Sequence, residues 1–74
     1  MSSITKTIRL SGKADGSIED AVRTVLARAA STIQDIHSFR IVEVGGEVDT
    51  SGAPTLFSVT IDITFGIMDP VVHG

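Results

Sequence analysis

The clearest pattern in the chain is a strict alternation of apolar and polar residues near its C-terminal end. The apolar positions are Phe57, Val59, Ile61, Ile63, Phe65 and Ile67, and the polar or small positions between them are Ser58, Thr60, Asp62, Thr64 and Gly66. A period of two among β-branched and aromatic residues is typical of a strand with one buried face. The pattern predicts a strand at about 55–68, roughly twice the usual length of a strand.

A second alternation lies at the other end of the chain. Ile4, Ile8 and Leu10 fall on one side of the segment 4–10, and polar residues occupy the other side, which predicts a half-buried strand. The turn-forming segment Ser11–Gly16 is expected to end it.

A third strand is predicted at about 38–49, with apolar residues on both faces. Phe39 and Ile41 alternate there with Ser38, Arg40, Val42 and Val44. The pair Gly45-Gly46 within this segment predicts a bulge or a sharp bend, and the hairpin loop Thr50–Pro54 follows it.

Between the first two predicted strands, the spacing of apolar residues changes to that of a helix. Ser17 is a favourable N-cap, and Glu19 and Asp20 occupy the first turn, where the helix dipole favours negative charge. One apolar stripe follows, formed by Ile18, Ala21, Val22, Val25, Leu26, Ala29, Ile33 and Ile36. The stripe predicts a helix at about 18–36, with His37 facing its C-terminal dipole.

These elements predict an α+β fold of order β-α-β-β, a three-stranded antiparallel sheet wrapped around one helix. We expect one domain over residues 1–74, with a tail at 69–74. One helix does not cover so long a sheet, which leaves apolar sheet surface for partner subunits.

Composition supports the expectation of partners. A chain of 74 residues buries a small core, and the absence of Cys removes disulfides and thiolate metal sites. A net charge of −3 with six scattered Lys and Arg gives no basic stripe for nucleic acid. Neither an apolar run of about 20 residues nor a signal peptide is found, so no membrane association is expected, and we predict a soluble cytoplasmic protein.

The reactive residue types point away from an enzyme. Five carboxylates could act as acid or base, but they are better explained as solvated charges of strands and turns: Glu43, Glu47, Asp49, Asp62 and Asp69. No base is paired with a nucleophile, and His37 and His73 do not form a ligand-spaced pair. We expect no catalytic residues.

Several local segments carry a resemblance to a known family. They are Leu10-Ser11-Gly12, Ser17–Val22, Leu26–Ile33, Phe39–Glu43 and Phe57–Ile61 with Phe65. In order, spacing and total length they resemble the dodecins, small β-α-β-β proteins that assemble as hollow homododecamers and bind flavins. The resemblance extends from about Ile4 to Met68.

The resemblance also implies where a ligand would bind. Flavin-binding dodecins stack the flavin ring on a Trp at the position of Ser38, and hydrogen-bond its edge with a Gln at the position of Ser58. Glu43 matches an acidic position near that pocket. Basic residues that contact phosphate in some members are replaced by Gly45 and Gly66.

Three functions stay open at this point. The first is storage or sequestration of a flavin, FMN or riboflavin, in an atypical pocket lined by Ser38, Ser58 and Glu43. The second is a dodecin-like homododecamer without flavin, which binds another small ligand or a divalent cation such as Mg²⁺ or Ca²⁺ at its symmetry axes, where Glu43, Glu47 or Asp62 would converge in several copies. The third is a structural or partner-binding module that pairs through the edge of its long third strand.

Overall fold

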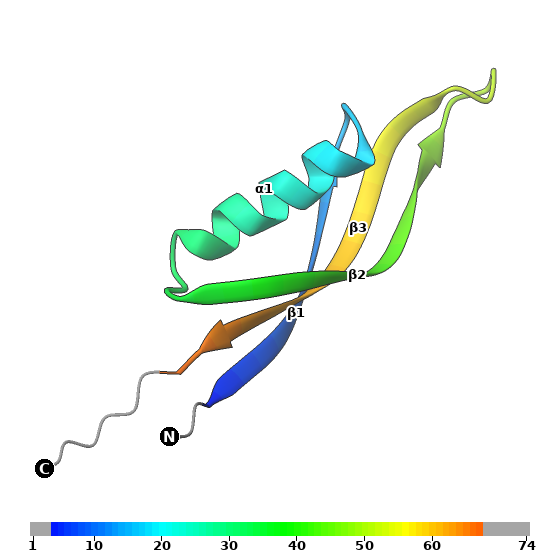
Figure 1. The fold of residues 1–74 in the computed structure, drawn as a ribbon. Helices are drawn as coiled ribbons and strands as arrows, with labels where there is room; N and C mark the ends of the chain where they lie inside the picture. Colours follow the sequence, from blue (N-terminus) through cyan, green and yellow to red (C-terminus); the bar gives the residue numbers. More distant parts are fainter. Residues whose placement is uncertain (1–3, 68–74) are drawn as a thin grey trace, which may run out of the picture.

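The computed structural model describes residues 4–67. The chain forms β1 (Thr5–Ala14), α1 (Ile18–Ala30), β2 (Ile36–Val48) and β3 (Pro54–Gly66). The three strands make one antiparallel sheet in the order β1-β3-β2, and α1 lies across one face of it (Figure 1). The predicted β-α-β-β order and the antiparallel sheet with one helix are confirmed.

The core lies between β3 and α1. Val59, Ile61 and Ile63 of the central strand are at most 2% exposed, as the strict alternation along β3 predicted. They pack with the buried residues of the predicted helical stripe, which are Ala21, Val22, Val25 and Ala29. Ser17 caps α1 as expected, since its side chain accepts a hydrogen bond of 3.0 Å from the amide of Asp20.

The predicted end of the helix is wrong. The helix ends at Ala30, and the chain turns back through residues 31–35. The hydroxyl of Ser31 donates to the carbonyl of Arg28 at 2.6 Å, which satisfies a carbonyl that no further helical turn reaches. Asp35 then adopts a left-handed backbone conformation, with φ of 63°, and a helix does not continue through it. Ile33 and Ile36 are still partly buried against the core, because the reversal of the chain brings them there.

The early end of α1 also corrects the prediction for His37. This residue is the second of β2 and does not face the helix C-terminus. Its Nε2 lies 3.3 Å from Oδ2 of Asp35. The predicted tail at 69–74 lies outside the described residues.

Strand β1 is longer than predicted. It continues through Ser11–Ala14, where turn-forming residues were expected to end it, because those residues pair with the long central strand from Ser11↔Thr60 to Ala14↔Phe57. Gly12 makes this possible, since a Cβ on it would collide with Cγ2 of Val25 on the helix. A residue without a side chain is therefore required where β1 passes beneath α1.

Of the two alternatives predicted at Gly45-Gly46, the bulge is wrong, because these glycines pair in register with Ser58 and Phe57, and the sharp bend stays a prediction. The register shifts instead between Ile36 and Ser38, between Ile41 and Glu43, and between Glu47 and Val48. At the second shift Val42 is the additional residue, so Val44 lies on the same face as Ile41 and not on the opposite face.

Strand β2 carries most of the exposed apolar surface. Its residues Phe39, Ile41, Val42, Val44 and Val48 are each 40–64% exposed. The helix packs mainly on β1 and β3, and the β2–β3 hairpin reaches beyond the end of the helix (Figure 1). The Cα radius of gyration of 16.2 Å exceeds the value of about 11 Å expected for a compact domain of this length. The protomer is an extended body with uncovered apolar sheet.

The helix within residues 4–67, α1, does not have the length and apolar character needed to cross a bilayer.

The contact between Gly12 and Val25 gives a first test. We expect Gly12→Ala to lower the free energy of unfolding by about 1–3 kcal/mol, because the stiff, buried side chain of Val25 has to shift. Urea denaturation at a fixed protein concentration measures the change. Gly45→Ala is the matched control, since a Cβ there would lie 3.5 Å from Oγ of Ser58, an ordinary contact. Equal stability of the two variants would contradict the close approach of β1 and α1.

Candidate functional site

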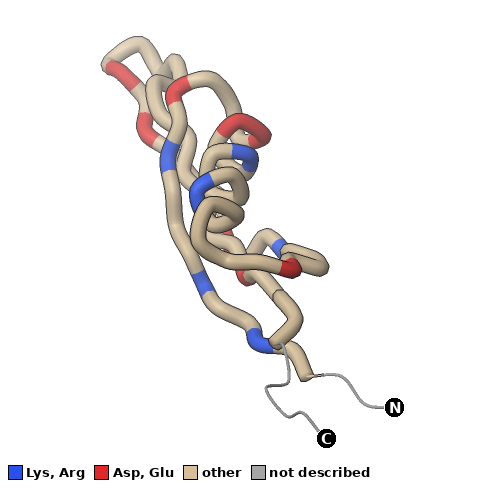
Figure 2. Tube along the Cα trace, turned by 90° about the vertical axis from the view of Figure 1, so that its left-hand side faces the viewer, with Lys and Arg blue, Asp and Glu red and all other residues tan. Residues whose placement is uncertain are grey.

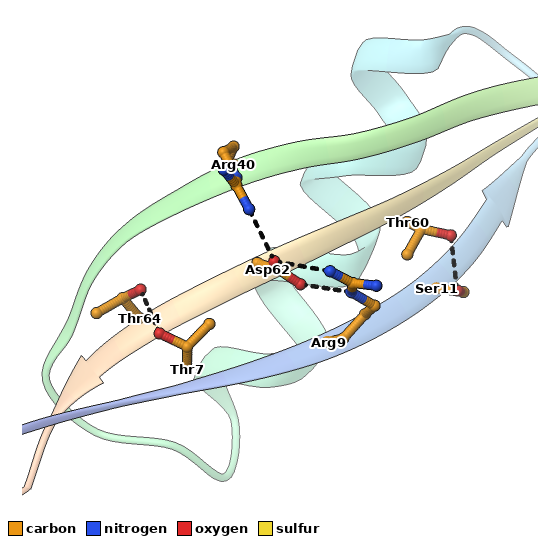
Figure 3. Close-up of polar contacts among 7 residues, drawn as sticks. All are labelled: Thr7, Arg9, Ser11, Arg40, Thr60, Asp62 and Thr64. Carbon is orange, nitrogen blue, oxygen red and sulfur yellow. Dashed lines mark hydrogen bonds and ion pairs between the residues drawn. The ribbon is translucent and has the colours of Figure 1, made fainter.

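The face of the sheet opposite α1 is polar along most of its length. Residues directly opposite each other in an antiparallel pair lie on the same face, so the register brings together polar residues from all three strands. We call this set the polar face; its members are Thr7, Arg9, Ser11, Lys13, Ser38, Arg40, Glu43, Ser58, Thr60, Asp62 and Thr64. Figure 3 shows seven of them on the side of the sheet away from the helix.

Asp62, on the central strand, is the centre of the polar face. Arg9 on β1 holds it with two contacts, Nε to Oδ1 at 2.7 Å and Nη2 to Oδ2 at 3.1 Å. Arg40 on β2 approaches from the other side, with Nη2 3.4 Å from Oδ2. The hydrogen bonds from Arg9 lower the pKa of Asp62, and the same contact raises the pKa of Arg9. The three side chains tie the three strands together (Figure 3).

Pairs of hydroxyl groups flank this centre along the strands. Oγ1 of Thr7 and Oγ1 of Thr64 lie 2.9 Å apart on one side of Asp62, and Oγ of Ser11 and Oγ1 of Thr60 lie 2.9 Å apart on the other. Each hydroxyl can donate one hydrogen bond and accept others, so both pairs keep capacity for a ligand.

The predicted ligand residues Ser38, Ser58 and Glu43 all belong to the polar face, but they line two separate hollows. The first hollow, of about 350 Å³, is lined by Thr7, Ser38, Phe39, Arg40, Asp62 and Thr64. The second hollow, of about 230 Å³, is lined by Glu43, Val44, Gly45, Ser58, Val59 and Thr60. Ser38 pairs with Thr64, six positions from Ser58 on β3, which corresponds to about 20 Å along a strand. One protomer therefore brings Glu43 and Ser58 together and leaves Ser38 apart.

The carboxylates considered for a cation differ in their surroundings. Asp62 is compensated by two guanidinium groups and is a poor ligand for a cation. Within the part of the chain that the structure describes, Glu43 and Glu47 have no ion-pair partner. The same residues contain no group of three or more His, Asp or Glu side chains placed to hold a metal ion. A cation site built on Glu43 or Glu47 would need carboxylates from other copies of the chain.

The absence of a side chain at Gly66 has a local cause. A Cβ on Gly66 would collide with Oδ2 of Asp35, whose carbonyl accepts a hydrogen bond of 2.9 Å from the amide of Gly66. A basic residue, which the resemblance implies here, would require the exposed side chain of Asp35 to change its rotamer. Asp35 and Gly66 line a third hollow of about 350 Å³ at the C-terminal end of α1, together with Thr32, Ile33, Gln34 and Phe65.

Comparison with known proteins places this geometry in a family. The dodecin family model matches residues 4–68. The chain belongs to the dodecin family. A search of curated proteins gives no match, so the remaining comparisons are with solved structures.

Three solved dodecins share the fold of this chain. An arginine-to-alanine mutant of the Thermus thermophilus dodecin superposes with a TM-score of 0.85 at 24% identity, covering 92% of this chain and 100% of that chain. The dodecin from Streptomyces davaonensis gives a TM-score of 0.85 at 22% identity, covering 93% and 100%. A calcium-chelating immunodominant antigen, the calcium dodecin from Mycobacterium tuberculosis, gives a TM-score of 0.75 at 23% identity, covering 95% and 99%. The Mycobacterium protein is described as having a novel calcium-binding site.

A second carboxylate with a lowered pKa lies outside the polar face of this dodecin. Asp49 accepts hydrogen bonds from the hydroxyl of Ser51 at 2.6 Å, the amide of Ser51 at 2.9 Å and the amide of Ala53 at 3.0 Å. These bonds lower the pKa of Asp49 and fix the turn between β2 and β3.

The lowered pKa of Asp62 predicts a loss of stability in acid. Its pKa in the folded protein lies below the ordinary value of 3.8, so its contribution is fully present above about pH 4 and is lost as the pH falls through the folded pKa. We expect Asp62→Asn to be less stable than the wild type at pH 7 and to lose less stability between pH 5 and pH 2. Asp49 accounts for part of the acid dependence that remains.

Urea denaturation at several pH values measures this difference. Asp15→Asn removes one carboxylate from the loop before α1 and controls for the change in net charge. If Asp62→Asn keeps the full acid dependence of the wild type, the ion pairs with Arg9 and Arg40 do not stabilise the folded protein.

Proposed function

We propose that the protein is a homo-oligomeric small-molecule-binding dodecin, expected to be a dodecamer, which stores or sequesters a flavin on the polar face. FMN and riboflavin are the candidate ligands. The observation that carries the proposal is the position of the two hollows. One is lined by Ser38 and the other by Ser58 and Glu43. These are the three positions at which the resemblance to the family implies a flavin pocket.

The exposed apolar surface of β2 supports the assembly. Phe39, Ile41 and Val44 lie on the same face of the sheet as the core residues of β3, but the helix does not cover them. Removal of such surface from water contributes a transfer free energy of about 25 cal/mol per Å² of apolar area, which is opposed by the entropy cost of association. A second copy is the partner that the family membership favours.

The separation of the two hollows determines how a pocket could be formed. A flavin that contacts Ser38 and Ser58 together would take Ser38 from one protomer and Ser58 with Glu43 from another, since one protomer holds them about 20 Å apart. Binding would then depend on assembly. A dissociated protomer would carry two half-sites and would lose the ligand.

Ser38 and Ser58 make such a pocket weaker than one with an indole and a carboxamide. An aromatic stack contributes about 0.5–1.5 kcal/mol beyond the area it buries, and a typical hydrogen bond contributes about 0.5–1.5 kcal/mol net. The hydroxyl groups of the polar face compensate in part, because they can bond to the edge or the ribityl chain of a flavin.

A divalent cation is the second candidate ligand. Glu43 and Glu47 have no ion-pair partner among residues 4–67, and hard cations such as Mg²⁺ and Ca²⁺ prefer carboxylate oxygens. The calcium dodecin of Mycobacterium tuberculosis offers a parallel for such a site in this family. Here the site would form at a symmetry axis, with one carboxylate from each of several copies.

Light scattering tests the assembly. We expect a particle of about twelve times 7.8 kDa. Ile41→Asp should dissociate it, because a charge would be buried in the contact surface of β2. Thr24→Asp, on the exposed side of α1, is the control and should leave the particle intact.

A wild-type protein that is a stable monomer would contradict the proposed assembly. The same samples with a chelator such as EDTA test the second candidate, since a structural cation at an axis predicts dissociation. An unchanged particle in EDTA, with no calcium bound in equilibrium dialysis, would reject it.

Fluorescence quenching of riboflavin and FMN tests the ligand. We expect binding by the wild type and about 2- to 10-fold tighter binding by Ser38→Trp, which supplies a stacking ring at the first hollow. Thr24→Trp places the same ring on the helix surface and should not change the affinity. Absence of quenching by both the wild type and Ser38→Trp would exclude a flavin from this site.

A further inference from the structure

The charges at the centre of the polar face do not cancel. Two guanidinium groups approach one carboxylate, which leaves a net positive charge. Arg9 engages both oxygens of Asp62 in the fork geometry that satisfies a carboxylate well. Arg40 makes only the longer contact of 3.4 Å, and its side chain is 78% exposed. Arg40 therefore has several N–H donors that Asp62 does not use.

Hydroxyl groups surround this exposed guanidinium. Ser38, Thr7 and Thr64 line the first hollow with Arg40, in a volume of about 350 Å³. Thr7 and Thr64 bond to each other, so only one of their two hydroxyl hydrogens is used, and the other can point into the hollow (Figure 3). The side chain of Ser38 has no hydrogen-bond partner in the described part of the chain. The hollow thus combines neutral donors with a guanidinium that Asp62 contacts only at 3.4 Å, and the carboxylate of Asp62, which also lines the hollow, is held by Arg9.

We propose that the first hollow binds a phosphate group. Arg40 donates to two of the phosphate oxygens, as a planar guanidinium does for oxyanions, and the hydroxyls of Ser38 and of the Thr7–Thr64 pair donate to the others. Arg9 is a positioning residue, because it neutralises Asp62, which would otherwise repel the anion. The phosphate is either the free ion or a monoester on a small molecule such as FMN.

The site is distinct from the phosphate contacts that the family resemblance implies. Those contacts fall at Gly45 and Gly66, which have no side chain, and neither residue lines the first hollow. The inference does not depend on a flavin ring. Where the proposed function holds, the phosphate site would make the protein bind FMN more tightly than riboflavin.

The acidic residues near the first hollow do not prevent an anion from binding there. Asp62 is held by Arg9, and Glu43 lines the second hollow, on the far side of the Val42 bulge from Arg40. Figure 2 shows several acidic residues gathered towards the hairpin end of the molecule, while basic residues are spaced along β1. The first hollow lies towards the opposite end of the sheet, where β1 and β2 begin and β3 ends.

Thermal unfolding of the assembled protein in inorganic phosphate tests the site. A ligand that binds only the folded state stabilises it by RT ln(1 + [L]/Kd), so the melting temperature keeps rising with the logarithm of the ligand concentration above Kd. We expect the melting temperature to rise in phosphate, relative to sodium chloride of equal ionic strength, with the logarithmic dependence on concentration that this relation gives, and the affinity is fitted from it. Arg40→Gln should weaken the fitted affinity about tenfold or more, since it removes the charged donors. Arg28→Gln, which removes the same charge from the last turn of α1, should retain the wild-type affinity.

Ser38→Ala is a second variant that leaves the ion pairs of Asp62 intact. It should weaken phosphate binding by a smaller factor, and it keeps the test decisive if Arg40→Gln fails to fold. A melting temperature that rises equally in phosphate and chloride, or an effect of phosphate that is the same in wild type, Arg40→Gln and Ser38→Ala, would overturn the proposal.

Titrations with FMN and riboflavin separate this inference from the proposed function. FMN binding that is tighter than riboflavin binding, and that inorganic phosphate inhibits, identifies the phosphate of a monoester as the ligand. A response to phosphate that depends on Arg40, without binding of either flavin, would support the phosphate site and overturn the flavin function. Equal binding of FMN and riboflavin, with no effect of Arg40→Gln, would overturn the phosphate site and leave the flavin function standing.

Discussion

The packing of α1 on alternate residues of β3 is the contact on which the rest of the structure depends. Val59, Ile61 and Ile63 are almost completely buried by the helix, and they fix which face of the central strand is inside. Because side chains alternate strictly along a strand, the same contact places Thr60, Asp62 and Thr64 together on the opposite face. The core therefore also determines the polar face. The pairing of β1 and β2 with β3 then decides which of their residues lie on the buried face and which lie on the polar face.

One short helix limits how much of this sheet can be covered. Strands β2 and β3 each have 13 residues, about 40 Å of extended chain, and α1 also has 13 residues but spans only about 20 Å. The helix packs mainly on β1 and β3, so the apolar residues of β2 are left in contact with solvent in a single protomer. In the proposed assembly, another copy would cover this surface of β2 and so add to a small core. The uncovered apolar surface of β2 therefore follows from a sheet that is longer than its helix, and the length of β3 also separates the two hollows.

The sequence predicts the elements with a uniform period and misses the places where the period is interrupted. The alternation along β3 and the start of α1 at Ser17 were predicted correctly, because local spacing and capping determine them. The helix end was missed because Ile33 and Ile36 continue the helical spacing, although the helix has ended at Ala30 and the chain turns back through residues 31–35. The triad of Arg9, Asp62 and Arg40 was missed because it depends on register between strands far apart in sequence. Alternation placed Arg9 and Asp62 on the polar sides of their strands, but no local signal aligns them with each other.

The bulge at Val42 shows how a single added residue lets β2 serve two different surfaces. Before the bulge, Arg40 lies on the polar face beside Asp62, and Ile41 lies on the apolar face opposite Ile61. An unbroken strand would then place Val42 and Val44 on the polar face and turn Glu43 towards the apolar side, since a shift of one residue exchanges the two faces. The bulge prevents this, so that Glu43 pairs with Thr60 beside Ser58 and Val44 pairs with Val59. Both the second hollow and the exposed apolar surface of β2 therefore depend on a feature that the period of the sequence does not reveal.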